Sequence, residues 1–160
     1  MTVIARPTDP TTSTTSPLGT ARRLAADDAL WRPHLDFDPV SRYYRRLLAD
    51  GAHEAWLLTW LPGQGTPWHD HGGSAGAFVV LQGVLVERTA RHGLVRGIRR
   101  IHTRGASHAF GPEYVHRVTN EGPDPAVSLH VYAPRLASMT DYDEHDGILE
   151  AVATRTAEAW

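Results

Sequence analysis

The chain has 160 residues, a formal net charge of −2 and no cysteine. This length corresponds to one domain that can bury roughly 70% of its unfolded surface, and the absence of cysteine excludes disulfides, thiolate metal ligands and a cysteine nucleophile. The small net charge gives no reason to expect a nucleic acid or an anionic membrane as a partner. No apolar run suits a signal peptide or a membrane span, so we expect a soluble, cytoplasmic protein.

The N-terminal segment differs in composition from the rest of the chain. Residues 1–19 are rich in Thr, Ser and Pro, and such a segment cannot bury enough apolar surface to offset the entropy lost on ordering. We therefore expect a disordered tail over residues 1–19, followed by a single domain over residues 20–160.

Two helices are expected at the start of this domain. Residues 20–31 contain good helix formers, and Pro33 stops the helix because it lacks a backbone N–H. A second helix is expected over residues 39–49, where Asp38 is a natural N-cap and Pro39 suits the first helical position.

From residue 54 onwards, short apolar runs alternate with turn residues. This pattern is typical of a small β-barrel or sandwich, and no alternation of strands with helices appears. Residues 54–61 have little polarity on either face and predict a central strand, in which Trp60 is most simply a core residue. Residues 139–154 predict a closing hairpin, and a C-terminal helix is the alternative for this segment.

Three histidines have the spacing of a metal site. His69 and His71 are two positions apart, and on a strand such residues point to the same face. His116 follows a Gly-Pro turn at the start of another expected strand. A single histidine is most often an ordinary hydrogen-bonded residue, but this combination predicts a site for a first-row transition metal.

The other histidines give weaker signals. His92 falls in a turn, and His102 alternates outward along its expected strand, so both are predicted to lie on the surface. His108 precedes the turn at Pro112 and is close enough in sequence to approach the metal site.

Residues 126–132 alternate between polar and apolar side chains. Ser128, His130 and Tyr132 share one face of the expected strand, with three apolar residues on the other. Two interpretations stay open at this point. The polar face is either hydrated at the surface or forms a hydrogen-bonded relay that points into a barrel.

The spacing of these motifs resembles the cupin superfamily. Residues 63–83 are similar to the first cupin motif and residues 105–120 to the second, although Gly76 stands where the first motif usually has a glutamate ligand. With the polar strand at residues 128–132, the chain resembles the cysteine dioxygenase family over about residues 38–143. This resemblance implies a mostly β cupin barrel with short N-terminal helices.

The resemblance also implies ligands and a substrate anchor. It implies that iron(II) is held by three histidines, His69, His71 and His116. It further implies that Arg45 binds the carboxylate of the substrate and that Tyr43 adds a hydrogen bond there. A register slip of one residue would give this role to Arg46.

The remaining implied site residues surround the metal. Tyr132 is held by His130 and Ser128 and lies beside the metal, with Trp60 flanking the site behind it. Gly76 is typical of bacterial members of the family, whereas the animal enzymes carry a cysteine there that is crosslinked to the tyrosine. Because this chain has no cysteine, that crosslink cannot form.

The activity implied by the resemblance is iron-dependent oxidation of L-cysteine by dioxygen to cysteine sulfinate, in a monomer whose partners are a small thiol and dioxygen. One alternative is a dioxygenase of another thiol such as 3-mercaptopropionate, whose enzymes carry glutamine in place of Arg45. Cysteamine fits less well, since it has no carboxylate. The other alternative is a non-enzymatic cupin with a structural metal. Such metals usually have a closed shell of ligands, whereas this site lacks its fourth ligand because Gly76 replaces the usual glutamate.

Overall fold

A computed structural model describes residues 16–157 of the chain. Most of the predicted tail, residues 1–15, and the last three residues, 158–160, lie outside this described part. In the rest of the predicted tail, Ser16 is the N-cap of the first helix, which begins at Pro17. None of the described helices is long and apolar enough to cross a bilayer.

The first predicted helix, over residues 20–31, is two helices. α1 (Pro17–Ala25) is followed by α2 (Asp28–Trp31) and then by the short 3₁₀ helix η1 (Arg32–His34). The carboxylate of Asp27 accepts a hydrogen bond from a backbone N–H in the first turn of α2, at 3.2 Å. Asp27 therefore caps a new helix N-terminus inside the stretch that we expected to be continuous.

The second predicted helix, over residues 39–49, is wrong. Its C-terminal half is the strand β1 (Tyr44–Ala49), which pairs antiparallel with β2 (Glu54–Trp60). Asp38 accepts a hydrogen bond from the backbone N–H of Val40 at 2.7 Å, but it closes a turn and not a helix. Pairing with β2, in which every residue is buried, outweighs the local helix propensity.

The described residues have the mostly β architecture that the sequence predicts. After β1 and β2 the strands follow one another with short connections. In chain order they are β3 (Trp68–His69), β4 (Ala75–Gln82), β5 (Val84–Arg91), β6 (Leu94–Thr103), β7 (Ser107–Phe110), β8 (Val115–Thr119), β9 (Ala126–Ala133), β10 (Ser138–His145) and β11 (Ile148–Thr156).

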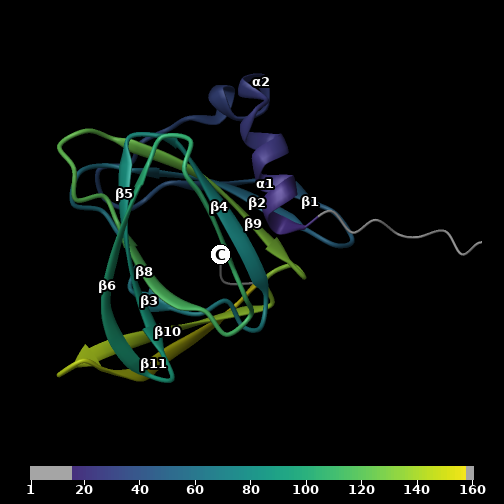
Figure 1. Cartoon of the computed structure of the whole chain (residues 1–160). Helices are drawn as coiled ribbons and strands as arrows, with labels where there is room; N and C mark the ends of the chain where they lie inside the picture. Colours follow the sequence, from purple (N-terminus) through teal and green to yellow (C-terminus); the bar gives the residue numbers. More distant parts are fainter. Residues whose placement is uncertain (1–15, 158–160) are drawn as a thin grey trace, which may run out of the picture.

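The strands form two walls around a common interior (Figure 1). One wall is a five-stranded sheet in the order β1-β2-β9-β4-β7, and the other closes on itself in the order β10-β11-β6-β5-β8-β3. α1 packs on the outer face of the first wall, against β4 and β9. The hairpin of β10 and β11 is the closing hairpin predicted from the sequence.

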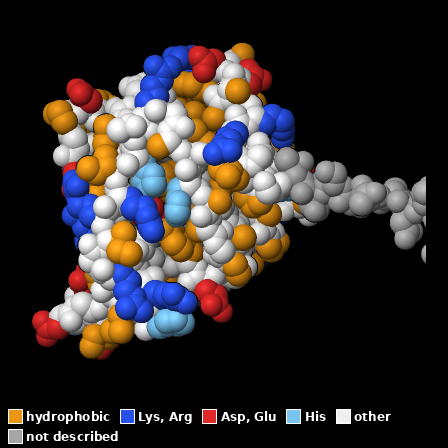
Figure 2. Space-filling model, viewed as in Figure 1, with side chains coloured by type: hydrophobic (Ala, Val, Ile, Leu, Met, Phe, Trp, Pro, Cys, Tyr) orange, Lys and Arg blue, Asp and Glu red, His pale blue; other side chains and the backbone are white. Residues whose placement is uncertain are grey.

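In the surface view, basic and acidic side chains both appear, and histidine side chains are visible near the middle of this face (Figure 2).

β9 separates two apolar clusters and gives the barrel its polar interior. On the face of the sheet that α1 covers, the apolar residues of β9 pack with Leu57 and Trp31. These residues of β9 are Val127, Leu129 and Val131. Its other face points into the barrel, where Tyr132 packs in one cluster with Trp60 and Phe78. The alternation read from the sequence therefore places three hydrogen-bonding side chains in the interior: Ser128, His130 and Tyr132.

Candidate metal centre

Two of the predicted metal ligands lie on neighbouring strands. β3 pairs with β8 so that His69 stands directly opposite His116. Facing residues on adjacent strands have their side chains close together, and here the two imidazole rings lie 4.7 Å apart between centroids.

His71 reaches the same place from a loop. β3 ends at His69, so the two histidines do not share a strand as the sequence suggested. Asp70, between them, holds the loop against β10: its carboxylate accepts hydrogen bonds from the backbone N–H of Thr140 at 3.0 Å and from the hydroxyl of Tyr142 at 2.7 Å. These bonds fix the direction in which His71 leaves the strand.

The three imidazoles form a buried cluster. One ring nitrogen from each of His69, His71 and His116 lies within 4.8 Å of the others, and all three side chains are buried. Burial lowers the pKa of His69 and of His71 well below the ordinary value, and the neighbouring histidines lower both further. The rings of His69 and His71 are therefore neutral, which is the form that binds metal.

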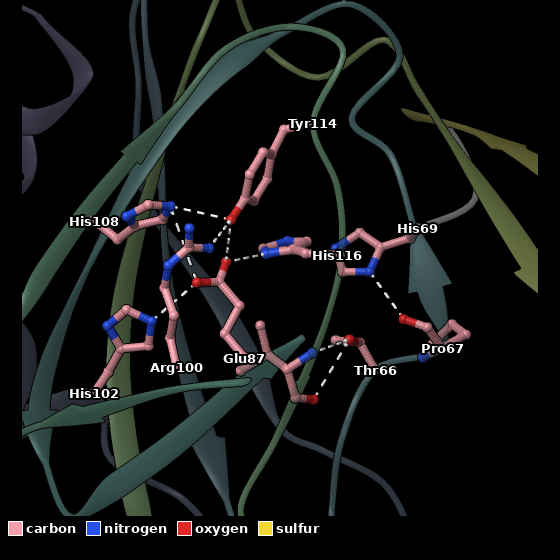
Figure 3. Close-up of polar contacts among 10 residues, drawn as sticks. Thr66, Pro67, His69, Glu87, Arg100, His102, His108, Tyr114 and His116 are labelled. Carbon is pink, nitrogen blue, oxygen red and sulfur yellow. Dashed lines mark hydrogen bonds and ion pairs between the residues drawn. The ribbon is translucent and has the colours of Figure 1, made fainter. Parts of the chain in front are cut away.

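The hydrogen bonds of the cluster leave a nitrogen free on each ring. Nδ1 of His69 lies 3.0 Å from the carbonyl oxygen of Pro67, and Nδ1 of His116 lies 2.8 Å from Oε1 of Glu87 (Figure 3). Both nitrogens of His71 are buried and have no hydrogen-bond partner among the described residues. An unsatisfied buried polar atom is costly, and a metal ion bound by the three rings would remove that cost for one of the two nitrogens of His71.

Position 76 has no room for a side chain that could act as a fourth metal ligand. A Cβ atom at this position would lie 2.6 Å from the Phe110 ring and 2.9 Å from the Tyr132 ring. The Phe110 ring stacks on His71, with centroids 4.7 Å apart and an angle of 24° between the planes. An apolar ring therefore packs against Gly76 where the cupin motif usually carries glutamate.

The polar face of β9 is hydrogen-bonded inside the barrel. Oγ of Ser128 lies 2.8 Å from Nε2 of His130, and Nε1 of Trp60 donates a hydrogen bond to the same Oγ at 2.9 Å. Within residues 16–157 this chain of bonds does not extend to Tyr132, whose ring lies 6.5 Å from that of His130. The relay expected from the sequence ran from Ser128 through His130 to Tyr132, and the structure forms only its first step, with Trp60 as a further donor to Ser128. Tyr132 stands beside it, 5.1 Å from the His71 ring.

A cavity of about 100 Å³ opens in front of the histidines. His69, His116 and Tyr132 lie in its wall, together with an apolar group. That group comprises Trp56, Leu58, Trp60, Val118, Leu136 and Met139. The metal cluster is therefore joined to a mainly apolar pocket of the size of a small molecule.

Two arginines line this pocket, Arg42 and Arg155, and Arg45 does not. Arg155 is already paired with a carboxylate, since its Nη2 lies 2.8 Å from Oδ1 of Asp141. The guanidinium of Arg42 lies over the Trp60 ring, 4.7 Å from its centroid. Its Nε and Nη1 atoms are buried and make no hydrogen bond within the described part of the chain. Burial is the main cause that lowers the pKa of Arg42 from its ordinary value, while Tyr132 partly offsets this effect. An arginine nevertheless keeps its charge in proteins.

The strand β1 explains why the residues expected to bind the substrate carboxylate do not reach the pocket. Arg45 pairs with Leu57, which faces α1, so its exposed side chain lies on the opposite side of the sheet from the pocket. Tyr43 is not among the pocket residues either. Arg46 is on the pocket side but lies over the Trp56 ring, 5.6 Å from its centroid, with an exposed side chain. The structure thus corrects the placement of Arg45, Arg46 and Tyr43, because a strand alternates where a helix was expected.

A buried carboxylate next to His116, that of Glu87, was not predicted from the sequence. Glu87 is 0% exposed and is hydrogen-bonded to His102 and His116. Burial raises the pKa of Glu87, but these two hydrogen bonds outweigh it and hold the pKa well below the usual range. The prediction that His102 lies on the surface is wrong, since its ring is buried against this carboxylate. The signal in the sequence was a charged residue on the same strand face as Leu85, which is fully buried.

Relatives of known identity match most of the chain. The model of the family described as cysteine dioxygenase type I matches residues 20–145. Cysteine dioxygenase type 1 from Danio rerio is 31% identical over 128 residues, which are 73% of this chain and 63% of that protein. The enzyme of the same name from Rattus norvegicus is 28% identical over 132 residues, which are 76% of this chain and 66% of that protein. The chain thus spans a little under two thirds of the length of these relatives.

Solved structures confirm the cupin fold. A Thermus thermophilus protein has a TM-score of 0.57 and 25% identity, over 65% of this chain and 93% of that one. A Klebsiella pneumoniae protein described as having a double-stranded β-helix domain has a TM-score of 0.57 and 17% identity, over 76% and 93%. The family model covers well over half of the sequence, and the described residues hold a three-histidine cluster that fits a metal cofactor. The chain belongs to the cysteine dioxygenase type I family.

Proposed function

We propose that this protein is an iron(II)-dependent thiol dioxygenase that oxidises L-cysteine to cysteine sulfinate. The observation that carries the proposal is a buried guanidinium with unpaired nitrogens in the wall of the pocket that is also lined by two members of the three-histidine cluster, His69 and His116. The partners are then a small thiol and dioxygen. The cytoplasmic location and the monomeric state stay predictions from the sequence.

Arg42 is the group that binds the carboxylate of the substrate. Its planar fork of N–H donors matches the two oxygens of a carboxylate. A carboxylate in the pocket would accept hydrogen bonds from Nε and Nη1, which are otherwise buried without partners within residues 16–157. We therefore assign to Arg42 the role that the family resemblance had implied for Arg45.

His69, His71 and His116 are the residues that hold the metal. Three neutral imidazoles leave the charge of a divalent ion uncompensated, and the packing at Gly76 supplies no carboxylate. When bound, iron(II) supplies a positive charge that lowers the pKa of a thiol ligand and a redox centre for the reaction with dioxygen. The choice of iron rests on the family, because imidazole suits several first-row metals.

Tyr132 and the apolar wall prepare the pocket for this reaction. Burial is the main cause that raises the pKa of Tyr132 above its ordinary value, so the phenol keeps its proton and can donate a hydrogen bond to the bound substrate. Trp56, Leu58 and Met139 limit the access of water. Both atoms of one dioxygen molecule end on sulfur, so sulfur loses the four electrons that dioxygen gains and no further reductant is needed.

Other thiols distinguish this proposal from its alternatives. 3-Mercaptopropionate is a second candidate because its carboxylate also suits Arg42, whereas cysteamine has no carboxylate. We expect the anaerobically iron(II)-loaded protein to consume dioxygen with L-cysteine at least about tenfold faster, in kcat/KM, than with cysteamine, since a charged hydrogen bond is worth roughly 1.5–3 kcal/mol. The measurement is dioxygen uptake with each thiol in parallel. Turnover only with 3-mercaptopropionate would show that this thiol, and not L-cysteine, is the substrate. If no thiol caused dioxygen uptake, the protein would be a metal-binding module without this activity.

A further inference from the structure

A carboxylate is buried directly behind the metal cluster. Glu87 lies on β5 beside β8, two residues before Thr89, which stands opposite His116. Glu87 and Thr89 therefore share a strand face, and the Glu87 side chain reaches His116 diagonally inside the barrel. Its side chain is 0% exposed, so its charge is compensated by protein groups and not by solvent.

Three side-chain donors converge on this carboxylate (Figure 3). Oε1 lies 2.8 Å from Nδ1 of His116 and accepts a hydrogen bond from the hydroxyl of Tyr114 at 3.0 Å. Oε2 lies 2.9 Å from Nε2 of His102. His108 also contacts the Tyr114 hydroxyl, at 3.1 Å from its Nε2. Glu87 is thereby held in one orientation by residues of β6, of β8 and of the turn before β8.

This contact fixes the state of His116. A carboxylate only accepts hydrogen bonds, so Nδ1 of His116 carries the proton and Nε2 has the free electron pair. The three histidines differ in this respect. His69 has a neutral carbonyl at its Nδ1, and His71 has no hydrogen-bond partner among the described residues. His116 is the one member of the cluster that faces a negative charge.

We propose that Glu87 is a positioning residue that sets the tautomer and direction of the His116 ring and, through its charge, strengthens His116 as a metal ligand. The inference rests on the three-histidine metal site of the proposed function but not on the reaction with thiols. Partners of this kind orient metal-binding histidines and raise their basicity. The same charge stabilises the more oxidised form of a bound redox metal.

The test is the metal affinity of Glu87→Gln without thiol or dioxygen. Glutamine keeps the shape and can still accept a hydrogen bond, but it removes the charge. We expect the affinity for Co²⁺, measured by competition with a chelator, to fall by about 10-fold to 100-fold, and the Fe³⁺/Fe²⁺ reduction potential to rise. Glu121→Gln is the matched control: it makes the same change at a carboxylate that is paired with Arg88 and Arg99 and is not part of the metal cluster, so it should keep the affinity within about twofold of wild type.

A folded Glu87→Gln with the wild-type Co²⁺ affinity and reduction potential would overturn the proposal and leave Glu87 as a buried structural group. Thermal unfolding establishes whether the variant is folded. If it is not, nitrogen NMR of the wild-type protein loaded with Zn²⁺ decides the question. We expect a proton on Nδ1 of His116, and the opposite tautomer would contradict the proposal. Because neither measurement uses a thiol, a failure of the proposed dioxygenase activity would be seen separately.

Discussion

Replacing Arg42 by alanine is expected to raise the KM for L-cysteine by roughly 100-fold while the bound iron stays at the wild-type level. Removing one partner of a buried charged pair costs about 2–5 kcal/mol, and 1.4 kcal/mol corresponds to a factor of ten. The guanidinium is in the pocket wall but is not a metal ligand, so the loss should fall on substrate binding. Steady-state dioxygen uptake and metal analysis of the same sample measure the two quantities.

Arg45→Ala is the matched control, because it removes the same side chain from a nearby position on the other side of the sheet. We expect its KM to stay within about twofold of wild type, as for most exposed substitutions. A large effect of Arg45→Ala with little effect of Arg42→Ala would show that the carboxylate is bound by the residue that the family resemblance first implied. Arg42→Lys should rescue only part of the affinity, since an ammonium lacks the planar fork.

Replacing His116 by alanine is expected to abolish stoichiometric metal binding. Only two imidazoles would then remain in the cluster, and both the ligand and its contact with Glu87 would be lost. Metal content after anaerobic loading and removal of excess ion is the measurement. We expect a value near zero, with activity lost in proportion.

His145→Ala provides the control for this loss. His145 is an exposed histidine at the end of β10, and it is not part of the metal cluster. Its replacement should leave the metal content unchanged. Retention of one tightly bound ion by a folded His116→Ala variant would mean that another residue is the third ligand.

The metal site was predictable because its signals are local. His69 and His71 are close in sequence, and the third histidine begins a strand after a recognisable turn. The cross-strand pairing of His69 with His116 then brings the rings together. The polar face of β9 was likewise readable from simple alternation, because a strand of this kind has only two faces.

The substrate anchor was not predictable from local signals. Residues 39–49 carry helix-forming residues and an N-cap, but the pairing of β1 with β2 is a tertiary effect that overrides them. The wrong secondary structure led to the wrong choice of carboxylate-binding arginine. Side chains alternate along β1, so Arg45 points away from the pocket, whereas the turn before β1 brings Arg42 into it.

The group behind His116 was missed for a related reason. Glu87, His102 and Tyr114 lie far apart in the sequence, and only the registers of β5 with β6 and with β8 bring them together. His102 alternates as a surface residue would, and the carboxylate that it bonds lies 15 residues earlier in the chain, where its place on the same strand face as Leu85 is the one local signal. The steric role of Phe110 at Gly76 has the same origin, because it depends on the pairing of β4 with β7.

In the proposed reaction, both atoms of one dioxygen molecule are transferred to the sulfur of L-cysteine. The most direct test is turnover of L-cysteine by the iron(II)-loaded protein under isotopically labelled dioxygen, followed by mass spectrometry of the product. We predict cysteine sulfinate in which both sulfinate oxygens carry the label, formed in equal amount to the dioxygen consumed. Sulfinate with an unlabelled oxygen from water, or dioxygen consumption that yields only cystine, would contradict the assignment.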